Sequence, residues 1–350
     1  MASFIPYLVA FLFPTVAYGA MLGWHDYSWG LPFIAFVLLP IFDQLMPEQS
    51  IEFDKNTEQT RTLTWLYDIP LYALLPLQLG LVYTLCSVSA TLAVEDLNIH
   101  WLGVVFSIGI CCGTFGINVA HELGHRNGRL PQFAAKTFLL SSLYMHFIIE
   151  HNFGHHRHVA TPNDPATSRR DQTVYGFWLQ SIVGAWKSAW TIENTRITKK
   201  SLPLFKHKMW RAVVIQSMLL IGITLLFGVI ALLSFALAAL IGILLLETIN
   251  YLEHYGLQRT ETKNGRFERV QPHHSWNCNR SVGRLVLFEL TRHSDHHAHA
   301  KRPYQILKHY KDAPQLPAGY PAMIVLALCP PLWFAIMNPT LDAYSNLQSC

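Results

Sequence analysis

The hydrophobic pattern of the chain consists of long apolar runs separated by polar segments. Five of these runs approach or exceed the roughly 20 apolar residues that a helix needs to cross a hydrocarbon core of about 30 Å. We expect membrane spans at residues 4–22, 29–46, 69–94, 99–120, 212–229 and 233–252. The last two spans share one apolar tract about twice as long as a single crossing. The segment from Gly228 to Ser234 is expected to turn as a tight helical hairpin.

Two further apolar segments, residues 138–149 and 321–337, are shorter or contain the proline pair Pro330 and Pro331. A segment that is too short to cross the bilayer is tolerated at membrane depth only where protein or a cavity surrounds it. We therefore expect both segments to be buried, re-entrant or interfacial.

Composition agrees with a membrane protein. The chain is 51% hydrophobic and 14% charged, with a mean hydropathy of +0.24. Soluble domains carry about a quarter charged residues. The expected fold class is an all-α integral membrane protein, in which residues 1–350 form a single membrane-embedded domain.

The basic residues predict an orientation. In the six-span arrangement two of them lie between spans two and three, 13 between spans four and five, and 11 after span six, so all 26 fall on one side. The positive-inside rule assigns that side to the cytoplasm. Both termini and the segments 121–211 and 253–350 are therefore expected there. This charge suits anionic headgroups or an acidic protein, and no nucleic-acid partner is expected.

Nine of the 18 histidines form a pattern at the predicted cytoplasmic ends of the spans. Neutral imidazoles crowded together are costly to bury without partners, so we interpret these nine as metal ligands. Isolated histidines such as His100 are interpreted as amphipathic surface residues. The nine are His121 and His125 in HELGH, His151, His155 and His156 in EHNFGHH, His254 in NYLEH, and His293, His296 and His297 in LTRHSDHH.

Helical spacing shows which ligands can lie together. Residues at i and i+4 lie on one helix face, so the histidines of each motif can point at one metal: His121 with His125, His151 with His155, and the histidines at 293, 296 and 297 together. The sequence leaves open which histidines serve which metal. Zinc takes four ligands and octahedral iron six, so nine histidines imply two metals. The chain has no C-x-x-C pair, and a histidine site without thiolates favours iron for oxygen chemistry.

Five carboxylates accompany the histidine motifs. Each is expected to accept the distal N–H of a ligand histidine and thereby fix its tautomer. Solvation of an interfacial acid and direct ligation are the alternatives. No separate acid or base is assigned, and no residue of a substrate channel is identified. The five are Glu122, Glu150, Asp164, Glu253 and Asp295.

HELGH also matches the H-E-x-x-H pattern of zinc proteases, in which Glu122 would be the general base. Such a protease needs only one further ligand. Most of the other clustered histidines would then have no role, so a membrane zinc protease is the distant alternative.

The combination of H-x3-H, H-x3-HH and H-x2-HH resembles the histidine-box superfamily of integral-membrane di-iron enzymes, which includes fatty-acid desaturases. Within it, five stretches resemble the membrane alkane 1-monooxygenases. These stretches are HELGH, EHNFGHHRHVATPNDPATSRR, NYLEHYGLQR, PHHSWNCNR and LTRHSDHHAHAKRPY.

The resemblance implies that the nine histidines hold two Fe ions. It implies terminal hydroxylation of medium- or long-chain n-alkanes to 1-alkanols with O2, in the inner membrane of a bacterium, on an alkane that enters from the bilayer lipids. Electrons would come from rubredoxin and its NADH-linked reductase. The chain ends at Cys350 without a rubredoxin pattern, so we expect a separate donor or a donor encoded beyond that point.

A second interpretation keeps the metal site and changes the reaction. A membrane di-iron fatty-acyl desaturase or another lipid hydroxylase would need a carrier or headgroup site near the cytoplasmic surface, which the sequence does not identify. The product distinguishes these alternatives.

Overall fold

The computed structural model describes residues 4–23, 25–46, 48 and 53–349. Over these residues the regular elements are helices, and β pairing is limited to the isolated bridges Glu261–Phe267 and Asn277–Gln315. The expected all-helical fold is confirmed. The chain divides into two compact units: unit 1 comprises Met1–Leu38, Leu63–Ile149 and Ala189–Leu246, and unit 2 comprises Leu39–Thr62, Glu150–Ser188 and Glu247–Cys350.

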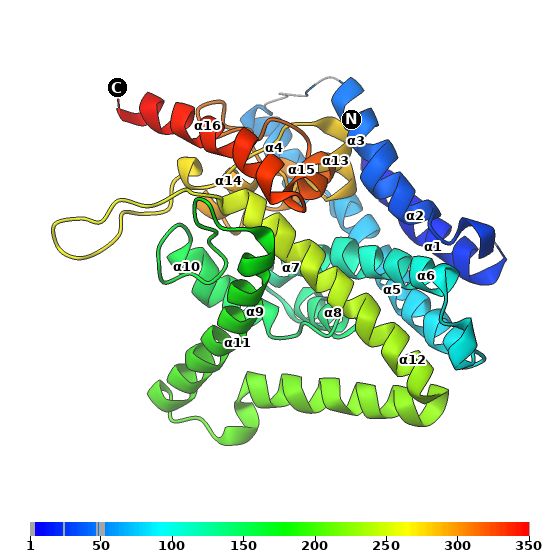
Figure 1. Cartoon of the computed structure of the whole chain (residues 1–350). Coiled ribbons are helices and arrows are strands. Elements are labelled where there is room, and N and C mark those ends of the chain that lie inside the picture. Colours follow the sequence, from blue (N-terminus) through cyan, green and yellow to red (C-terminus); the bar gives the residue numbers. More distant parts are fainter. Residues whose placement is uncertain (1–3, 24, 47, 49–52, 350) are drawn as a thin grey trace. The chain divides into compact units, whose positions relative to one another are not determined.

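Unit 1 contains most of the long apolar helices (Figure 1). Among the described residues, four helices have residues in both units: α4 (Lys55–Leu63), α9 (Phe147–Glu150), α11 (Val174–Lys199) and α12 (Lys208–His254). The remaining elements of unit 1 are η1 (Ile5–Phe11), α1 (Leu12–Leu22), η2 (His25–Tyr27), α2 (Gly30–Phe33), the π-helical η3 (Ile34–Leu38), η4 (Trp65–Tyr67), α5 (Asp68–Ser89), η5 (Val94–Asp96), α6 (Ile99–Cys111), the π-helical η6 (Cys112–Ile117), α7 (Asn118–Gly124), α8 (Arg129–Leu140) and η8 (Leu204–Lys206).

Among the residues that the structure describes, four continuous helices are long and apolar enough to cross a membrane: Ile5–Leu22, Trp65–Ser89, Ile99–Gly124 and Lys208–His254. They cover five of the six predicted spans, because the 47-residue Lys208–His254 covers the last two. The predicted span at 29–46 corresponds to Gly30–Leu45, which is apolar but shorter. The protein is therefore an integral membrane protein with four candidate spanning helices.

Helix α12 bends at Gly228. This residue has φ 86° and ψ 178°, outside the helical region, and a residue without a Cβ adopts such a conformation at least cost. Figure 1 shows α12 as two arms that meet at a sharp bend. The bend lies at the first residue of the predicted turn, and Ser234, at its other end, is already helical.

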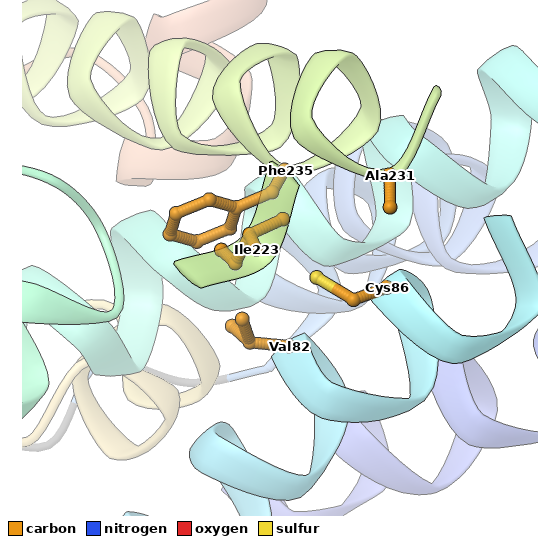
Figure 2. Packing of buried hydrophobic residues seen from close by; sticks show 5 residues of the cluster. All are labelled: Val82, Cys86, Ile223, Ala231 and Phe235. Carbon is orange, nitrogen blue, oxygen red and sulfur yellow. The ribbon is translucent and has the colours of Figure 1, made fainter. Parts of the chain in front are cut away.

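Both arms of α12 pack against α5. The core formed there is shown in Figure 2, and it consists of Val82, Cys86, Ile223, Ala231 and Phe235. Polar groups reinforce the contact, since the Ser89 hydroxyl lies 3.0 Å from Ser234 Oγ and Trp101 Nε1 donates to Ser234 Oγ at 2.9 Å. The second arm is thereby fixed to α5 and α6.

Small residues bring the second arm of α12 close to η6. A Cβ added to Gly242 would lie 2.7 Å from Cys112 Cβ and 2.8 Å from the backbone nitrogen of Gly113. Membrane helices use small residues in this way to let their backbones approach. The contact fixes the end of the third candidate span, and therefore α7 with its histidines, within unit 1.

Unit 2 consists mainly of short helices joined by loops, together with the 20-residue α16 (Pro330–Ser349). Its elements are α3 (Leu39–Leu45), α4 (Lys55–Leu63, whose last residue belongs to unit 1), the π-helical η7 (His151–His155), α10 (His156–His158), η9 (Pro272–His274), α13 (Ser281–Val286), α14 (His293–Ala298), η10 (Tyr304–Ile306), α15 (Tyr320–Ala327) and α16 (Pro330–Ser349). Asp43 on α3 accepts the backbone N–H groups of Val282 and Gly283 at 2.9 and 3.1 Å. This carboxylate holds the start of α13.

The two short apolar segments are helical in part. Residues 138–149 comprise the end of α8, a turn and the start of α9, and Phe138, Leu139 and Ile149 in them are buried. Residues 321–337 lie in α15 and α16. The segment is interrupted between Ala327, where α15 ends, and Pro330, where α16 begins. Pro330 and Pro331 are the first two residues of α16, where a missing N–H costs no helical hydrogen bond.

Candidate metal centre

The first histidine motif of unit 2 is π-helical. Residues His151–His155 form η7 and are followed directly by α10. In a π-helix the backbone hydrogen bonds repeat at i and i+5 rather than at i and i+4. The side chains follow this repeat: His151 Nε2 lies 3.0 Å from His156 Nε2. The i, i+4 spacing allowed His151 and His155 to share one metal, but the two residues lie in different groups.

A first histidine group in unit 2 consists of His151, His156 and His296. Their ligand atoms lie within 4.8 Å of one another. His156 Nε2 is central, since it also lies 3.0 Å from His296 Nε2 on α14. Two separate segments of the chain thus converge on this group.

A second histidine group consists of His155, His254, His293 and His297. All four residues are buried, and their ligand atoms again lie within 4.8 Å of one another. His155 Nε2 lies 3.2 Å from His297 Nε2, and His254 Nε2 lies 3.2 Å from His293 Nε2. The group is assembled from η7, from the last residue of α12 and from one face of α14.

Helix α14 divides its histidines between the two groups. His293 and His297 are one turn apart and share a face, whereas His296 points about 100° away from His297. The sequence spacing allowed all three histidines to serve one metal, but His296 lies in the other group. The groups touch, because the rings of His156 and His297 have centroids 4.5 Å apart.

The distances in both groups fit a bound metal. Ligands held at about 2.0–2.1 Å from a tetrahedral or octahedral ion lie roughly 2.9–3.4 Å from one another. The facing Nε2 pairs are separated by 3.0–3.2 Å. Burial holds the pKa of His297 well below its ordinary value, and neighbouring histidines lower it further. A neutral imidazole is the form that binds a metal.

Asp164 meets the expectation for a carboxylate behind a ligand histidine. Its Oδ2 accepts from Nδ1 of His155 at 2.9 Å and from the hydroxyl of Thr167 at 2.5 Å. Burial opposes ionisation of Asp164, but its contacts with His155 and Thr167 keep its pKa below the ordinary value. The carboxylate places the ring proton of His155 on Nδ1 and leaves the lone pair of Nε2 directed at the second group.

Glu253 is placed differently from the expectation. Its Oε2 lies 3.2 Å from Nε2 of His293, the nitrogen that also faces His254, rather than from the distal nitrogen. Its Oε1 accepts from the hydroxyl of Tyr320 at 2.9 Å. The carboxylate therefore lies on the inner side of the second group.

Glu150 and Asp295 contact other partners. Glu150 accepts from the Ser188 hydroxyl at 3.1 Å, and burial together with the charge of Asp164 raises its pKa to about 8. Asp295 accepts from His299 Nδ1 at 3.0 Å and from the backbone N–H of Lys308 at 2.8 Å, and it also binds Arg302 and Tyr310. These contacts tie Asp295 to the segment that follows α14.

In unit 1 the motif HELGH forms the end of α7. The rings of His121 and His125 face one another edge to face with centroids 5.1 Å apart. Glu122 accepts two hydrogen bonds from Arg126, at 2.9 and 3.0 Å. A carboxylate held by a guanidinium is a poor general base, which argues against the zinc-protease interpretation of this motif.

A third set of donors, Glu268, His273 and His274, lies elsewhere in unit 2 within 4.8 Å. Nδ1 of His274 accepts from the backbone N–H of Gln271 at 2.9 Å. Its ring proton is therefore on Nε2, which lies 3.3 Å from Glu268 Oε1. A protonated Nε2 has no lone pair for a metal, so these residues form a polar contact rather than a further ligand set.

Three contributing residues escaped the sequence interpretation. Thr167 follows Asp164 by three residues, a spacing typical of local polar turns, and this signal was present in the sequence. Ser188 and Tyr320 contact carboxylates far away in the chain. No local pattern marks those two residues.

Comparisons with known proteins identify the family of this chain. The model of the fatty acid desaturase family matches residues 99–327, more than half of the chain. Two alkane 1-monooxygenases of Pseudomonas aeruginosa, numbered 2 and 1, are each 39% identical to it. The alignments cover 97% and 91% of this chain and 91% and 85% of theirs. Alkane 1-monooxygenase 2 of Alcanivorax borkumensis is 44% identical over 69% of this chain and 64% of its own.

The resemblance carried by the histidine motifs is thus confirmed over most of the sequence. Because these relatives are monooxygenases, the zinc-protease alternative is not supported. The chain belongs to the alkane 1-monooxygenases, within the fatty acid desaturase family.

Proposed function

We propose that this protein hydroxylates the terminal carbon of medium- to long-chain n-alkanes to 1-alkanols, using O2 and electrons from rubredoxin at two histidine-bound irons. The observation that carries the proposal is the convergence of Nε2 atoms in two touching histidine groups of unit 2, in a chain of this family. Reaction with O2 is the chemistry of a metal or cofactor rather than of protein side chains, and these histidine groups could hold such a metal.

The proposed ligands are the nine clustered histidines. The four members of the second group would hold one iron. The other iron would be held by His151, His156 and His296, with His121 and His125 completing the set. Two observations support the last pair: they share a helix face at i and i+4, and the chain runs from Ile149 in unit 1 directly into Glu150 and His151 in unit 2.

Iron is the proposed metal because the donors are imidazoles without thiolates and the relatives are named monooxygenases. Bound iron would supply the activation of O2, so that one oxygen atom enters a terminal C–H bond and the other leaves as water with two electrons and two protons. Asp164 orients His155 for ligation, and burial keeps His297 neutral and excludes water from the group. The other carboxylates bind residues around the centre. Glu150 accepts from Ser188, Glu253 from Tyr320 and Asp295 from the backbone of Lys308, and Glu122 accepts from Arg126.

The proposed topology has six spans in a bacterial inner membrane. The two arms of α12 on either side of Gly228 would supply two of them, and Gly30–Leu45 the shortest. All 26 basic residues then fall on one side, so both termini and the metal centre would be cytoplasmic. An alkane has no polar handle, so it would reach the centre from the bilayer through apolar contacts alone, at roughly 0.8 kcal/mol per CH2 relative to water.

The proposed electron donor is rubredoxin, reduced by an NADH-linked reductase. The 350 residues contain no C-x-x-C pair for a cysteine-bound iron of the rubredoxin type, so within these residues no group other than the proposed histidine-bound centre carries electrons. The basic cytoplasmic loops would attract an acidic donor.

The test is product analysis with membranes that contain the protein, rubredoxin and its reductase, n-alkanes and isotopically heavy O2. We expect a 1-alkanol that carries the heavy atom, and about two irons per chain in the purified protein. His155→Ala should abolish the product and lower the iron content to about one. His100→Ala, at an exposed histidine outside the groups, is the matched control and should change neither value.

Other products would redirect the proposal. A new double bond in an acyl chain, without labelled alcohol, would identify a desaturase, which the name of the family model favours as the second candidate. Zinc in place of iron in an active preparation would contradict the proposed metal.

A further inference from the structure

A groove in unit 1 has no histidine in its lining. It has a volume of about 600 Å³ and runs between α8 and the start of α12. Residues 128–140 form most of one wall, and Met145, Arg211 and Ile215 complete the lining. None of its lining residues is among the proposed metal ligands or the carboxylates described above.

The α8 wall is one face of an amphipathic helix. Arg129, Phe133, Lys136 and Leu140 are spaced at i, i+4, i+7 and i+11, so they form a single stripe along the groove. The opposite face is packed into unit 1. Phe133 is nevertheless 65% exposed. Cations alternating with large apolar side chains on an uncovered face are typical of a helix that lies in a membrane interface.

The facing wall has the same composition. Arg211 and Ile215 lie one turn apart at the beginning of α12, which is the most apolar candidate span. A residue at the end of a spanning helix is at the level of the lipid headgroups. The walls are joined, because Gln216 Oε1 accepts from the backbone N–H of Met145 at 2.9 Å.

The charge of the groove is uncompensated. Its lining contains the three cations Arg129, Lys136 and Arg211 and no carboxylate. Within the part of the chain that the structure describes, none of these three side chains forms an ion pair. The cations therefore attract an anion, and the adjacent apolar side chains attract hydrocarbon.

We propose that this groove binds an anionic glycerophospholipid. The phosphate of the headgroup lies among Arg129, Lys136 and Arg211, and one acyl chain follows Phe133, Leu140 and Ile215. Seven residues of helix separate the two α8 cations by roughly 10 Å, a span that suits a headgroup with its glycerol rather than a single small anion. The apolar stripe likewise selects a lipid over free phosphate.

The test uses the full-length protein in nanodiscs that contain equal amounts of phosphatidylglycerol and phosphatidylcholine. Lipids retained after transfer to detergent are counted by native mass spectrometry. We expect selective retention of phosphatidylglycerol that added inorganic phosphate does not displace. In the variant Arg129→Gln/Lys136→Gln/Arg211→Gln, retention should weaken by on the order of fivefold for each cation removed.

The matched control is Lys199→Gln/Lys200→Gln/Lys206→Gln, which removes the same charge from exposed lysines of unit 1 outside the groove. It should retain the lipid like the wild type. Equal loss in both triple variants would reduce the effect to general surface charge and overturn the site. So would equal retention of phosphatidylcholine, displacement by phosphate, or full retention in the groove variant. If that triple variant does not fold, the single change Lys136→Gln at an exposed side chain carries the same comparison.

Discussion

The contact between Asp164 and His155 gives the sharpest prediction for the metal centre. The change is Asp164→Asn, which keeps the shape of the side chain and removes one acceptor oxygen. Both side chains are buried, at 0% and 1% exposure. The two oxygens of Asp164 accept from three donors: His155 Nδ1 at 2.9 Å, Thr167 Oγ1 at 2.5 Å and the backbone N–H of Ala166 at 3.1 Å.

Asparagine cannot satisfy these donors. The Thr167 hydroxyl already accepts from the backbone N–H of Ala160 at 2.9 Å, so its own hydrogen must go to residue 164. Wherever the new NH2 group is placed, it faces either the Ala166 N–H or the donors Thr167 and His155. In the second case His155 must accept at Nδ1. Its proton then moves to Nε2, where it blocks ligation.

The magnitude follows from either outcome. A buried donor without a partner costs about 1–3 kcal/mol, and loss of a carboxylate behind a metal-bound histidine typically lowers metal affinity about 10- to 100-fold, or about 1.4–2.7 kcal/mol. We therefore expect Asp164→Asn to weaken metal binding at the second histidine group by about 10- to 100-fold.

The assay is competition for iron with a chelator of known affinity, read out as metal bound per chain. Asp312→Asn is the matched control, since it makes the same chemical change at an exposed residue outside both groups. Metal affinity in Asp164→Asn within about threefold of the wild type, in a preparation where His155→Ala loses one metal, would refute the reasoning.

Three further predictions concern the fold. Gly228→Ala should destabilise the hairpin by about 1–3 kcal/mol because of its φ of 86°, whereas Gly222→Ala, which also has open space for a Cβ, should not lower Tm; equal shifts would contradict the bend. Burial raises the pKa of Glu193, but hydrogen bonds from Arg196 and from the backbone N–H of Lys208 outweigh burial, so the net pKa is lowered. The ionised carboxylate therefore stabilises the fold above its unfolded-state pKa, and this stabilisation is lost as the pH falls through its folded-state pKa. Glu193→Gln should consequently flatten the loss of Tm below about pH 4.5. Deletion of Phe153 should turn η7 into an α-helix, rotate the histidines that follow by roughly 100° and remove bound metal, whereas Phe153→Ala should retain it.

Spacing identified which histidines assemble but not how they are shared. The members of both groups in unit 2 all belong to the predicted nine, because a dense set of imidazoles at the ends of apolar runs has few structural explanations. Their grouping depended on the assumption of α-helical geometry. A single extra residue in η7 makes it π-helical and pairs His151 with His156 instead.

The hydropathy of the sequence predicted the positions of the spanning helices, but not which apolar run is too short to qualify as one. Apolar length predicts a crossing whatever the tertiary structure, so the positions of the four candidate spans agree with the sequence. The short helix Gly30–Leu45 falls near the limit of that criterion. Contacts such as Tyr320 with Glu253 join residues that are distant in sequence, and only the folded chain brings them together.

The adjacent histidine pairs explain why the two groups lie side by side. His155 and His156 are consecutive, and each faces a different group; His296 and His297 repeat this arrangement on α14. Consecutive residues of a helix point about 100° apart, so one turn of backbone sends one ligand to each group. The separation of the two proposed metals is then set by these two helical turns and needs no bridging carboxylate to define it. A change that unwinds either turn should consequently release both metals, whereas loss of one imidazole should release only one.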